Sequence, residues 1–373
     1  MEIYTGIGQF DFQILRFTGE LKKRYQEVSN DLKTIGHSII DFETWYLWWY
    51  AKAEEYEKKQ LLEIAMTYYR ASLFYLSFSD ERKLDAYQHF RRCFEACYQD
   101  KNITYHSIPY QSGNLPAIYI PCFGATETLL VIGGFDSFME ELVNWFYPLQ
   151  SQLNMNLLLF DGPGQGSVPF QRLYFDADYE KIVTTVLNEM HLEEVDAIGI
   201  SWGGYFVLRA AAFEKRIKRC ICFDIFYSGR DALQMQTGSS AYLLLRIGLF
   251  LKQKRLINSV ITDQAQSNVD LQWMLQQGFD ITGENNPYDF IKNITHHDLK
   301  GVLPLVTQEC LLLAGSEDRY VPKERLSVIQ KELTHAKKVT AKLFDSETGG
   351  ELHCQIDHIE PALKEIVTFL TTH

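Results

Sequence analysis

Apolar and polar residues follow two different patterns along this chain, one before and one after about residue 105. In the first part, residues 37–105 contain neither glycine nor proline, so no residue interrupts a helix there. Leu61, Ile64 and Tyr68 recur at the three- and four-residue spacing of a helix with one buried face. The sequence therefore predicts an all-helical N-terminal domain over residues 1–105, with its many aromatic side chains packed between the helices.

After residue 106, short apolar runs bounded by turn residues alternate with helical stretches. Continuous apolar strands of this kind are typical of a mostly parallel sheet that helices cover on both faces. The sequence therefore predicts an α/β domain over residues 106–373. The expected strands are 117–120, 129–132, 157–160, 197–200, 220–223, 310–313 and 341–344.

The alternation of strands and helices breaks between about residues 229 and 303. Residues 243–251 and 271–275 have helical patterns, and the whole stretch is too long for a simple connection between two strands. We interpret residues 229–303 as a helical cap inserted into the α/β domain.

The net charge and the lengths of the apolar runs argue against a nucleic-acid-binding protein and against a membrane-spanning one. The 373 residues carry 36 Lys and Arg against 48 Asp and Glu, which gives a net charge of −12. An acidic chain lacks the basic surface that binds nucleic acid, so no nucleic-acid partner is expected. The most apolar run, residues 241–251, is short and contains Arg246, so no membrane span is expected either.

The N-terminal residues and the cysteines indicate in which cellular compartment the protein is expected. Glu2 follows Met1, and no basic region precedes an apolar one at this end, so no signal peptide is expected. The seven cysteines are odd in number and show no paired spacing. Reduced thiols in a cytoplasmic protein are the simplest interpretation.

The strongest motif is Gly199-Ile200-Ser201-Trp202-Gly203, which follows an apolar strand and precedes a helical stretch. A strand–turn–helix elbow needs small residues around its serine, because the turn is strained and the strand and helix pack closely. Such a turn projects the serine hydroxyl from the carboxyl edge of the sheet. The context therefore predicts Ser201 as a nucleophile.

A serine nucleophile needs a base, and an acid that orients the base, in the chain order serine, acid, histidine. Asp318 follows the buried strand at 310–313, and Glu317 beside it is the alternative acid. His353 lies in a loop after the last predicted strand, where a base could reach the serine. His358 is the alternative base.

Acyl transfer also needs donors for the developing oxyanion. We expect one from the backbone N–H of Trp202, directly after the nucleophile. The loop after the strand at 129–132 contains Gly133 and Gly134, which allow close approach of the backbone. We assign the second donor to the N–H of Phe135, with Gly134 as the alternative.

Two other patterns do not indicate a cofactor. Residues 161–166, Asp-Gly-Pro-Gly-Gln-Gly, lack the Gly-Lys-Ser/Thr ending of a phosphate loop and the full dinucleotide spacing, so they predict a tight turn. His296 and His297 are not a metal pair without further ligands. No cofactor and no metal are expected.

Together these motifs resemble the α/β-hydrolase superfamily. A helical N-terminal domain before the motifs at 133–137, 161–166, 199–204 and 353–355 is similar to one branch. That branch contains 2,6-dihydropseudooxynicotine hydrolase, fermentation-respiration-switch-type esterases and fungal polyketide-shortening hydrolases, and its bacterial members are often described as acylaminoacyl-peptidase-like. The resemblance covers nearly the whole chain and implies an α/β-hydrolase fold with Ser201 as nucleophile, Asp318 as acid and His353 as base. The true peptidases carry a β-propeller, for which residues 1–105 offer no pattern.

We therefore expect a serine hydrolase that cleaves a small ester, amide or activated ketone through a covalent acyl-enzyme. The substrate would be a small molecule or a short acyl-peptide enclosed between the helical domain and the cap. An acylaminoacyl-peptidase-type exopeptidase is the alternative enzyme, and a regulatory or binding protein on a hydrolase scaffold is the alternative from another class. The aromatic-rich helical segment also suggests a homodimer.

Overall fold

The computed structural model describes residues 2–372, which form two compact units. The first unit runs to Asn102 and also contains Ala265–Asp280. The second comprises Ile103–Gln264 and the chain from Ile281 onward. Residues 265–280, which the sequence pattern assigned to the cap, thus group with the N-terminal helices.

The first unit is helical and has an aromatic core. The ring of Phe10 lies 5.3 Å from that of Trp45, and the Trp45 indole N–H donates to the carbonyl of Ala71 at 2.7 Å. Large aromatic side chains therefore pack the helices of this unit against one another. The helices are α1 (Gly8–Thr18), α2 (Leu21–Arg24), α3 (Gln26–Ile35), α4 (Phe42–Lys58), α5 (Leu62–Ser72), α6 (Glu81–Cys97) and most of α14 (Val269–Thr282).

Helix α14 joins this unit through specific contacts. The ring of Trp273 stacks on that of Phe74 with centroids 5.6 Å apart. The Asp280 carboxylate accepts hydrogen bonds from the Ser77 hydroxyl at 2.9 Å and the Phe78 N–H at 3.0 Å. These partners lie far from α14 in the sequence, so the local pattern that placed the segment in the cap could not reveal them.

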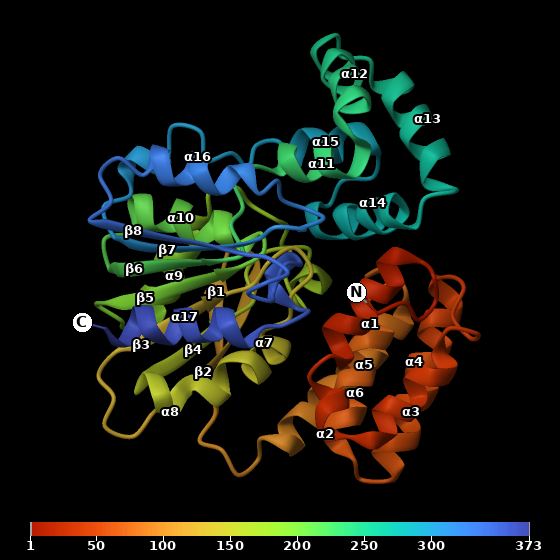
Figure 1. Ribbon diagram of the computed structural model, residues 1–373, viewed down its shortest axis with the longest axis horizontal. Helices are drawn as coiled ribbons and strands as arrows, with labels where there is room; N and C mark the ends of the chain where they lie inside the picture. Colours follow the sequence, from red (N-terminus) through yellow and green to blue (C-terminus); the bar gives the residue numbers. More distant parts are fainter. Residues whose placement is uncertain (1, 373) are drawn as a thin grey trace. The chain divides into compact units, whose positions relative to one another are not determined.

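The second unit is built on an eight-stranded sheet in the order β1-β2-β4-β3-β5-β6-β7-β8 (Figure 1). Strand β2 pairs antiparallel with both β1 and β4, and the other neighbours are parallel. The mostly parallel sheet that the apolar runs predicted is confirmed. The strands are β1 (Thr104–Tyr110), β2 (Gly113–Ile120), β3 (Thr128–Ile132), β4 (Asn156–Phe160), β5 (Val195–Ile200), β6 (Ile217–Phe223), β7 (Glu309–Gly315) and β8 (Lys338–Phe344).

Strand β1 is an element that the sequence pattern did not predict. It lies at an edge of the sheet, and only Ile108 among its residues is buried. An exposed edge strand lacks the continuous apolar run that marks the central strands. Its start at Thr104 also lies within the predicted helical domain.

Helices cover both faces of this sheet. Connections between parallel strands are right-handed, and the chain passes from β3 to β4 in one direction but from β5 to β6 in the other, so the two connecting helices lie on opposite faces. Helix α17 contacts α8 on one face, and α10 contacts α9 on the other. The helices of this unit are α7 (Met139–Phe146), α8 (Gln150–Leu153), α9 (Tyr179–Glu189), α10 (Gly203–Phe213), α11 (Gly229–Thr237), α12 (Ser239–Phe250), most of α13 (Lys254–Ala265), α15 (Pro287–Ile294), α16 (Glu324–Glu332) and α17 (Glu360–Thr371).

The fold brings the ends of the buried strands together. Strands β3, β4, β5, β6 and β7 are almost wholly buried, and their carboxyl ends meet at one edge of the sheet. In open α/β sheets this is the edge at which ligands bind. Among the described residues, none of the helices combines the length and apolar character needed to cross a membrane.

Candidate active site

Ser201 occupies a sharp turn between β5 and α10. Its φ of 58° lies in the left-handed region, which is costly for a residue with a side chain. The turn depends on small neighbours, because a Cβ at Gly199 would lie only 1.9 Å from the carbonyl oxygen of Gly203. The strand and the helix therefore approach closely, and Ser201 sits at the carboxyl edge of the sheet.

Ser201, His353 and Asp318 form a chain of hydrogen bonds. Nε2 of His353 lies 2.7 Å from Oγ of Ser201, and Nδ1 lies 2.6 Å from a carboxylate oxygen of Asp318. The other oxygen of Asp318 accepts the backbone N–H groups of Tyr320 at 2.6 Å and Val321 at 3.0 Å. This geometry fixes the imidazole with Nδ1–H toward the carboxylate and Nε2 facing the hydroxyl.

The alternative acid and the alternative base that the sequence offered, Glu317 and His358, lie outside this hydrogen-bonded path. Glu317 is exposed, and so is His358, whose ring nitrogen lies 3.5 Å from Glu360. The structure therefore brings together Asp318 and His353 with the serine, and leaves their close neighbours in the sequence at the surface.

Burial and charge shift the pKa values of the histidine and the carboxyl in opposite directions. Burial alone would raise the pKa of Asp318, but the charge of His353 and the hydrogen bonds to the carboxylate hold that pKa below its usual value. Burial alone would lower the pKa of His353, but the neighbouring Asp318 raises it well above 6.5. The site thus favours a charged carboxylate that stabilises an imidazolium.

A second buried carboxyl, Asp224, lies behind this pair at the end of β6 and was not predicted. It is fully buried, and one of its oxygens accepts the side-chain N–H of Gln355 at 3.2 Å and the backbone N–H of Cys354 at 3.4 Å. Burial, the charge of Asp318 and a hydrogen bond to it raise the pKa of Asp224 well above its usual value. The surroundings of Asp224 thus favour its protonated form, and its carboxyl oxygen holds the segment after His353.

Asp224, Asp318 and His353 also have the spacing of metal ligands, with one possible ligand atom of each within 4.8 Å of the others. Both ring nitrogens of His353 are already committed, one to Ser201 and one to Asp318. The ring therefore has no nitrogen left for a metal ion, and the donor set fits proton transfer better than metal binding.

The loop after β3 lies against the serine turn. A Cβ at Gly134 would lie 2.8 Å from the carbonyl oxygen of Ile200 and 3.0 Å from Cβ of Ser201, so only glycine allows this approach. The N–H of Gly134 donates to the hydroxyl of Ser137 at 2.8 Å, which occupies the alternative oxyanion donor. The backbone N–H of Trp202 has no acceptor among the described residues.

Gln165, within the glycine-rich turn after β4, fixes the loop after β3. Its side-chain amide donates to the carbonyls of Gly133 at 2.6 Å and Gly134 at 3.0 Å, and its oxygen accepts the hydroxyl of Tyr179 at 2.7 Å. The glycine-rich turn thus positions backbone at the site. The sequence predicted a tight turn here but did not reveal this role.

The side chain of Trp202 is held by a buried histidine. Its indole N–H donates to Nδ1 of His297 at 3.0 Å, and the ring of Phe175 stacks on the same histidine with centroids 5.0 Å apart. Burial lowers the pKa of His297 to about 3, so this imidazole is neutral. His297 therefore steadies the residue whose backbone follows the serine.

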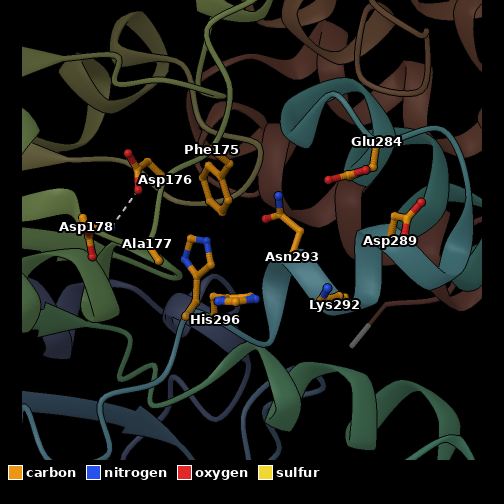
Figure 2. Close-up of a pocket in the computed structure, with 10 residues that line it drawn as sticks. Phe175, Asp176, Ala177, Asp178, Glu284, Asp289, Lys292, Asn293 and His296 are labelled. Atoms are coloured by element: carbon orange, nitrogen blue, oxygen red, sulfur yellow. Dashed lines mark hydrogen bonds between the residues drawn. The ribbon is translucent and has the colours of Figure 1, made fainter. Parts of the chain in front are cut away.

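A cavity of about 530 Å³ has His297 in its lining and does not include Ser201, Asp318 or His353. Figure 2 shows its charged lining, with acidic side chains on two sides of the opening and Phe175 and Asn293 between them. A lining this rich in charge does not suit an apolar acyl group. The cavity is thus distinct from the serine site, although His297 in its lining accepts the hydrogen bond of the Trp202 indole.

Comparisons with known proteins agree with this architecture. The model of the alpha/beta hydrolase fold family matches residues 118–344, which is more than half of the chain. The 20-hydroxy-prefusarin hydrolase FUS2 of Gibberella moniliformis is 28% identical to this chain, with 83% of this chain and 82% of that protein covered.

Two solved structures share the fold over nearly the whole chain. The 2,6-dihydroxy-pseudo-oxynicotine hydrolase is 18% identical, with a TM-score of 0.66 and 91% of each chain covered. AbyA5 is 16% identical, with a TM-score of 0.70 and 93% of this chain and 90% of that one covered. The resemblance that the sequence motifs carried is confirmed, and the chain belongs to the α/β-hydrolase family.

Proposed function

We propose that this protein is a serine hydrolase that cleaves a small ester, amide or activated ketone through a covalent acyl-enzyme on Ser201. The observation that carries the proposal is the continuous hydrogen-bonded path from Oγ of Ser201 through His353 to Asp318, with links of 2.7 and 2.6 Å. A serine hydroxyl becomes a useful nucleophile only when such a base takes its proton.

In the proposed reaction, Nε2 of His353 takes the hydroxyl proton as Oγ of Ser201 bonds to the substrate carbonyl carbon. The carbonyl oxygen becomes an oxyanion, which the backbone N–H groups of Trp202 and Phe135 stabilise. The bond to the leaving group then breaks, and the leaving group takes the proton from His353. Water attacks the acyl-enzyme with the same base, which releases the acid and restores the hydroxyl.

A fluorophosphonate probe tests the proposal directly. The wild type should gain the mass of one adduct, whereas Ser201→Ala should gain none and should lose hydrolysis of p-nitrophenyl esters. Ester hydrolysis that persists unchanged in a correctly folded Ser201→Ala protein would refute the mechanism. A wild type that forms no adduct would favour a binding protein on the same scaffold.

The alternative peptidase function is separated by substrate choice. Acyl-peptides and aryl esters with matched acyl groups should be compared by kcat/KM on the same preparation. A higher kcat/KM for the aryl esters supports the proposal, and a higher value for the acyl-peptides supports the exopeptidase.

A further inference from the structure

Helices α12 and α13 expose an unusual amount of apolar surface. Of the residues of α12, only Leu245 is buried, whereas Leu244 is 70% exposed and Phe250 is 85% exposed. Figure 1 shows these two helices at the outer end of the cap region of the second unit. We use "apolar stripe" for the exposed side chains of this helix pair: Leu243, Leu244, Ile247, Phe250, Leu251, Leu256 and Val260.

The stripe follows helical spacing. Positions 243, 247 and 250 are separated by four and three residues, so their side chains lie on one face of α12. In α13, Leu256 and Val260 are four residues apart. Exposed apolar side chains gathered on a helix face mark interaction sites, because they stay in contact with water unless a partner covers them.

The charge around the stripe is basic, in contrast to the rest of the chain. Residues 232–262 contain no Asp or Glu, and Asp263 is the one acidic residue of α12 and α13, although the whole chain has a net charge of −12. The segment carries Arg246, Lys252, Lys254 and Arg255. Lys254 pairs with Asp289, whereas Arg246, Lys252 and Arg255 are exposed and form no ion pair among the described residues.

We propose that the α12–α13 pair docks on an anionic lipid surface, with the apolar stripe in the headgroup boundary and the basic side chains on the lipid phosphates. Helices with an apolar face and Lys or Arg beside it bind bilayers in this way, by apolar burial combined with attraction to anionic lipid. Two symmetric copies joined through this stripe would bring identical basic segments together, so charge favours the lipid. The proposal is independent of the chemistry at Ser201.

Flotation of the full chain with vesicles tests the docking. The wild type should bind vesicles of phosphatidylcholine with phosphatidylglycerol, bind those of phosphatidylcholine alone much more weakly, and dissociate as salt is raised. Lys252→Gln with Arg255→Gln removes two charges and should weaken binding about 25-fold, at about fivefold per charge. Leu244→Glu with Phe250→Glu should weaken it by at least about tenfold.

Phe123→Glu is the matched control, because Phe123 is a fully exposed aromatic residue on the loop between β2 and β3 and lies outside the stripe. It should bind vesicles as the wild type does. Absence of binding to the anionic vesicles, or equal binding by the Leu244→Glu/Phe250→Glu variant, would overturn the proposal.

Light scattering on the same samples tests whether a second copy of the protein, rather than lipid, covers the apolar stripe. A wild type that is dimeric without lipid, and a Leu244→Glu/Phe250→Glu variant that is monomeric, would show that a second copy covers the stripe. That result would also overturn the proposal. An unchanged circular dichroism spectrum is expected for the variant, since both side chains are exposed.

Discussion

Two helices of the second unit have similarly apolar sequences and opposite surroundings. Helix α10 buries nine of its 11 residues, and its partners are strands β5 and β6 of the same chain. Helix α12 buries only Leu245 of its 12 residues. Apolar composition therefore shows that a helix needs a partner, but only the structure shows whether the chain supplies it.

The difference also separates two kinds of role. Helix α10 begins directly after the serine turn, and it lies so close to the end of β6 that a Cβ at Gly204 would be 2.3 Å from the carbonyl oxygen of Asp224. Its burial thus holds the candidate active site. Helix α12 contributes no residue to the hydrogen-bonded path of that site, so changes there should leave chemistry and folding intact.

The largest expected effect is on kcat/KM, when the buried carboxyls of the candidate active site beside α10 are replaced. Asp318→Asn should lower kcat/KM about 10³- to 10⁴-fold, because an amide cannot stabilise the imidazolium or hold its tautomer. Asp224→Asn should lower it less than about tenfold, because the neutral acid is replaced by another neutral group that can donate a hydrogen bond. Steady-state kinetics with a p-nitrophenyl ester measures both.

Equal losses in the two variants would contradict the assignment of charge to Asp318 and of the proton to Asp224. Probe labelling of both variants provides the control, since it reports on the serine separately from turnover.

The proximity of Ser201, Asp318 and His353 was predictable from the sequence. Each residue follows a predicted strand, and they occur in the order serine, acid, histidine that the elbow motif implies. Asp224 also directly follows a predicted strand, and that position at the carboxyl edge was the available sign. It was missed because a single carboxyl without a motif resembles any residue of a turn.

The fold was predictable wherever burial is continuous. The central strands are apolar throughout, so their runs stand out, whereas the exposed edge strand β1 has no such pattern. Grouping of Ala265–Asp280 with the N-terminal helices depends on contacts such as Trp273 with Phe74, about 200 residues away in the sequence, which no local pattern contains.

Leu208, fully buried in α10, gives the next effect. Leu208→Ala should lower the free energy of unfolding by about 2–5 kcal/mol, because the lost transfer energy adds to the cost of a cavity in a packed interior. Urea unfolding followed by circular dichroism measures the change. A loss below about 1 kcal/mol would mean that α10 is less tightly packed than its contacts indicate.

Turnover at the site beside α10 and vesicle binding by α12 and α13 should also differ in their dependence on pH. Because Asp318 raises the pKa of His353 well above 6.5, the free enzyme holds this base protonated at lower pH. Since only neutral His353 can take the serine proton, kcat/KM should rise about tenfold per pH unit up to a midpoint above 6.5. A midpoint below 6.5 would contradict the raised pKa of His353. The α12–α13 segment contains no histidine, so vesicle binding should not follow this curve.

The smallest expected effect is that of Leu244→Ala on α12, the counterpart of Leu208→Ala on α10. Both substitutions remove the same atoms from a leucine in an apolar helix, but Leu244 is 70% exposed and leaves no cavity behind. The free energy of unfolding of the isolated protein should therefore change by less than about 0.5 kcal/mol, and kcat/KM should stay constant. Urea unfolding without lipid, at a concentration where the protein is monomeric, gives the value. If Leu244→Ala costs as much as Leu208→Ala under those conditions, then the isolated chain itself buries this face of α12, and the contrast between the two helices fails.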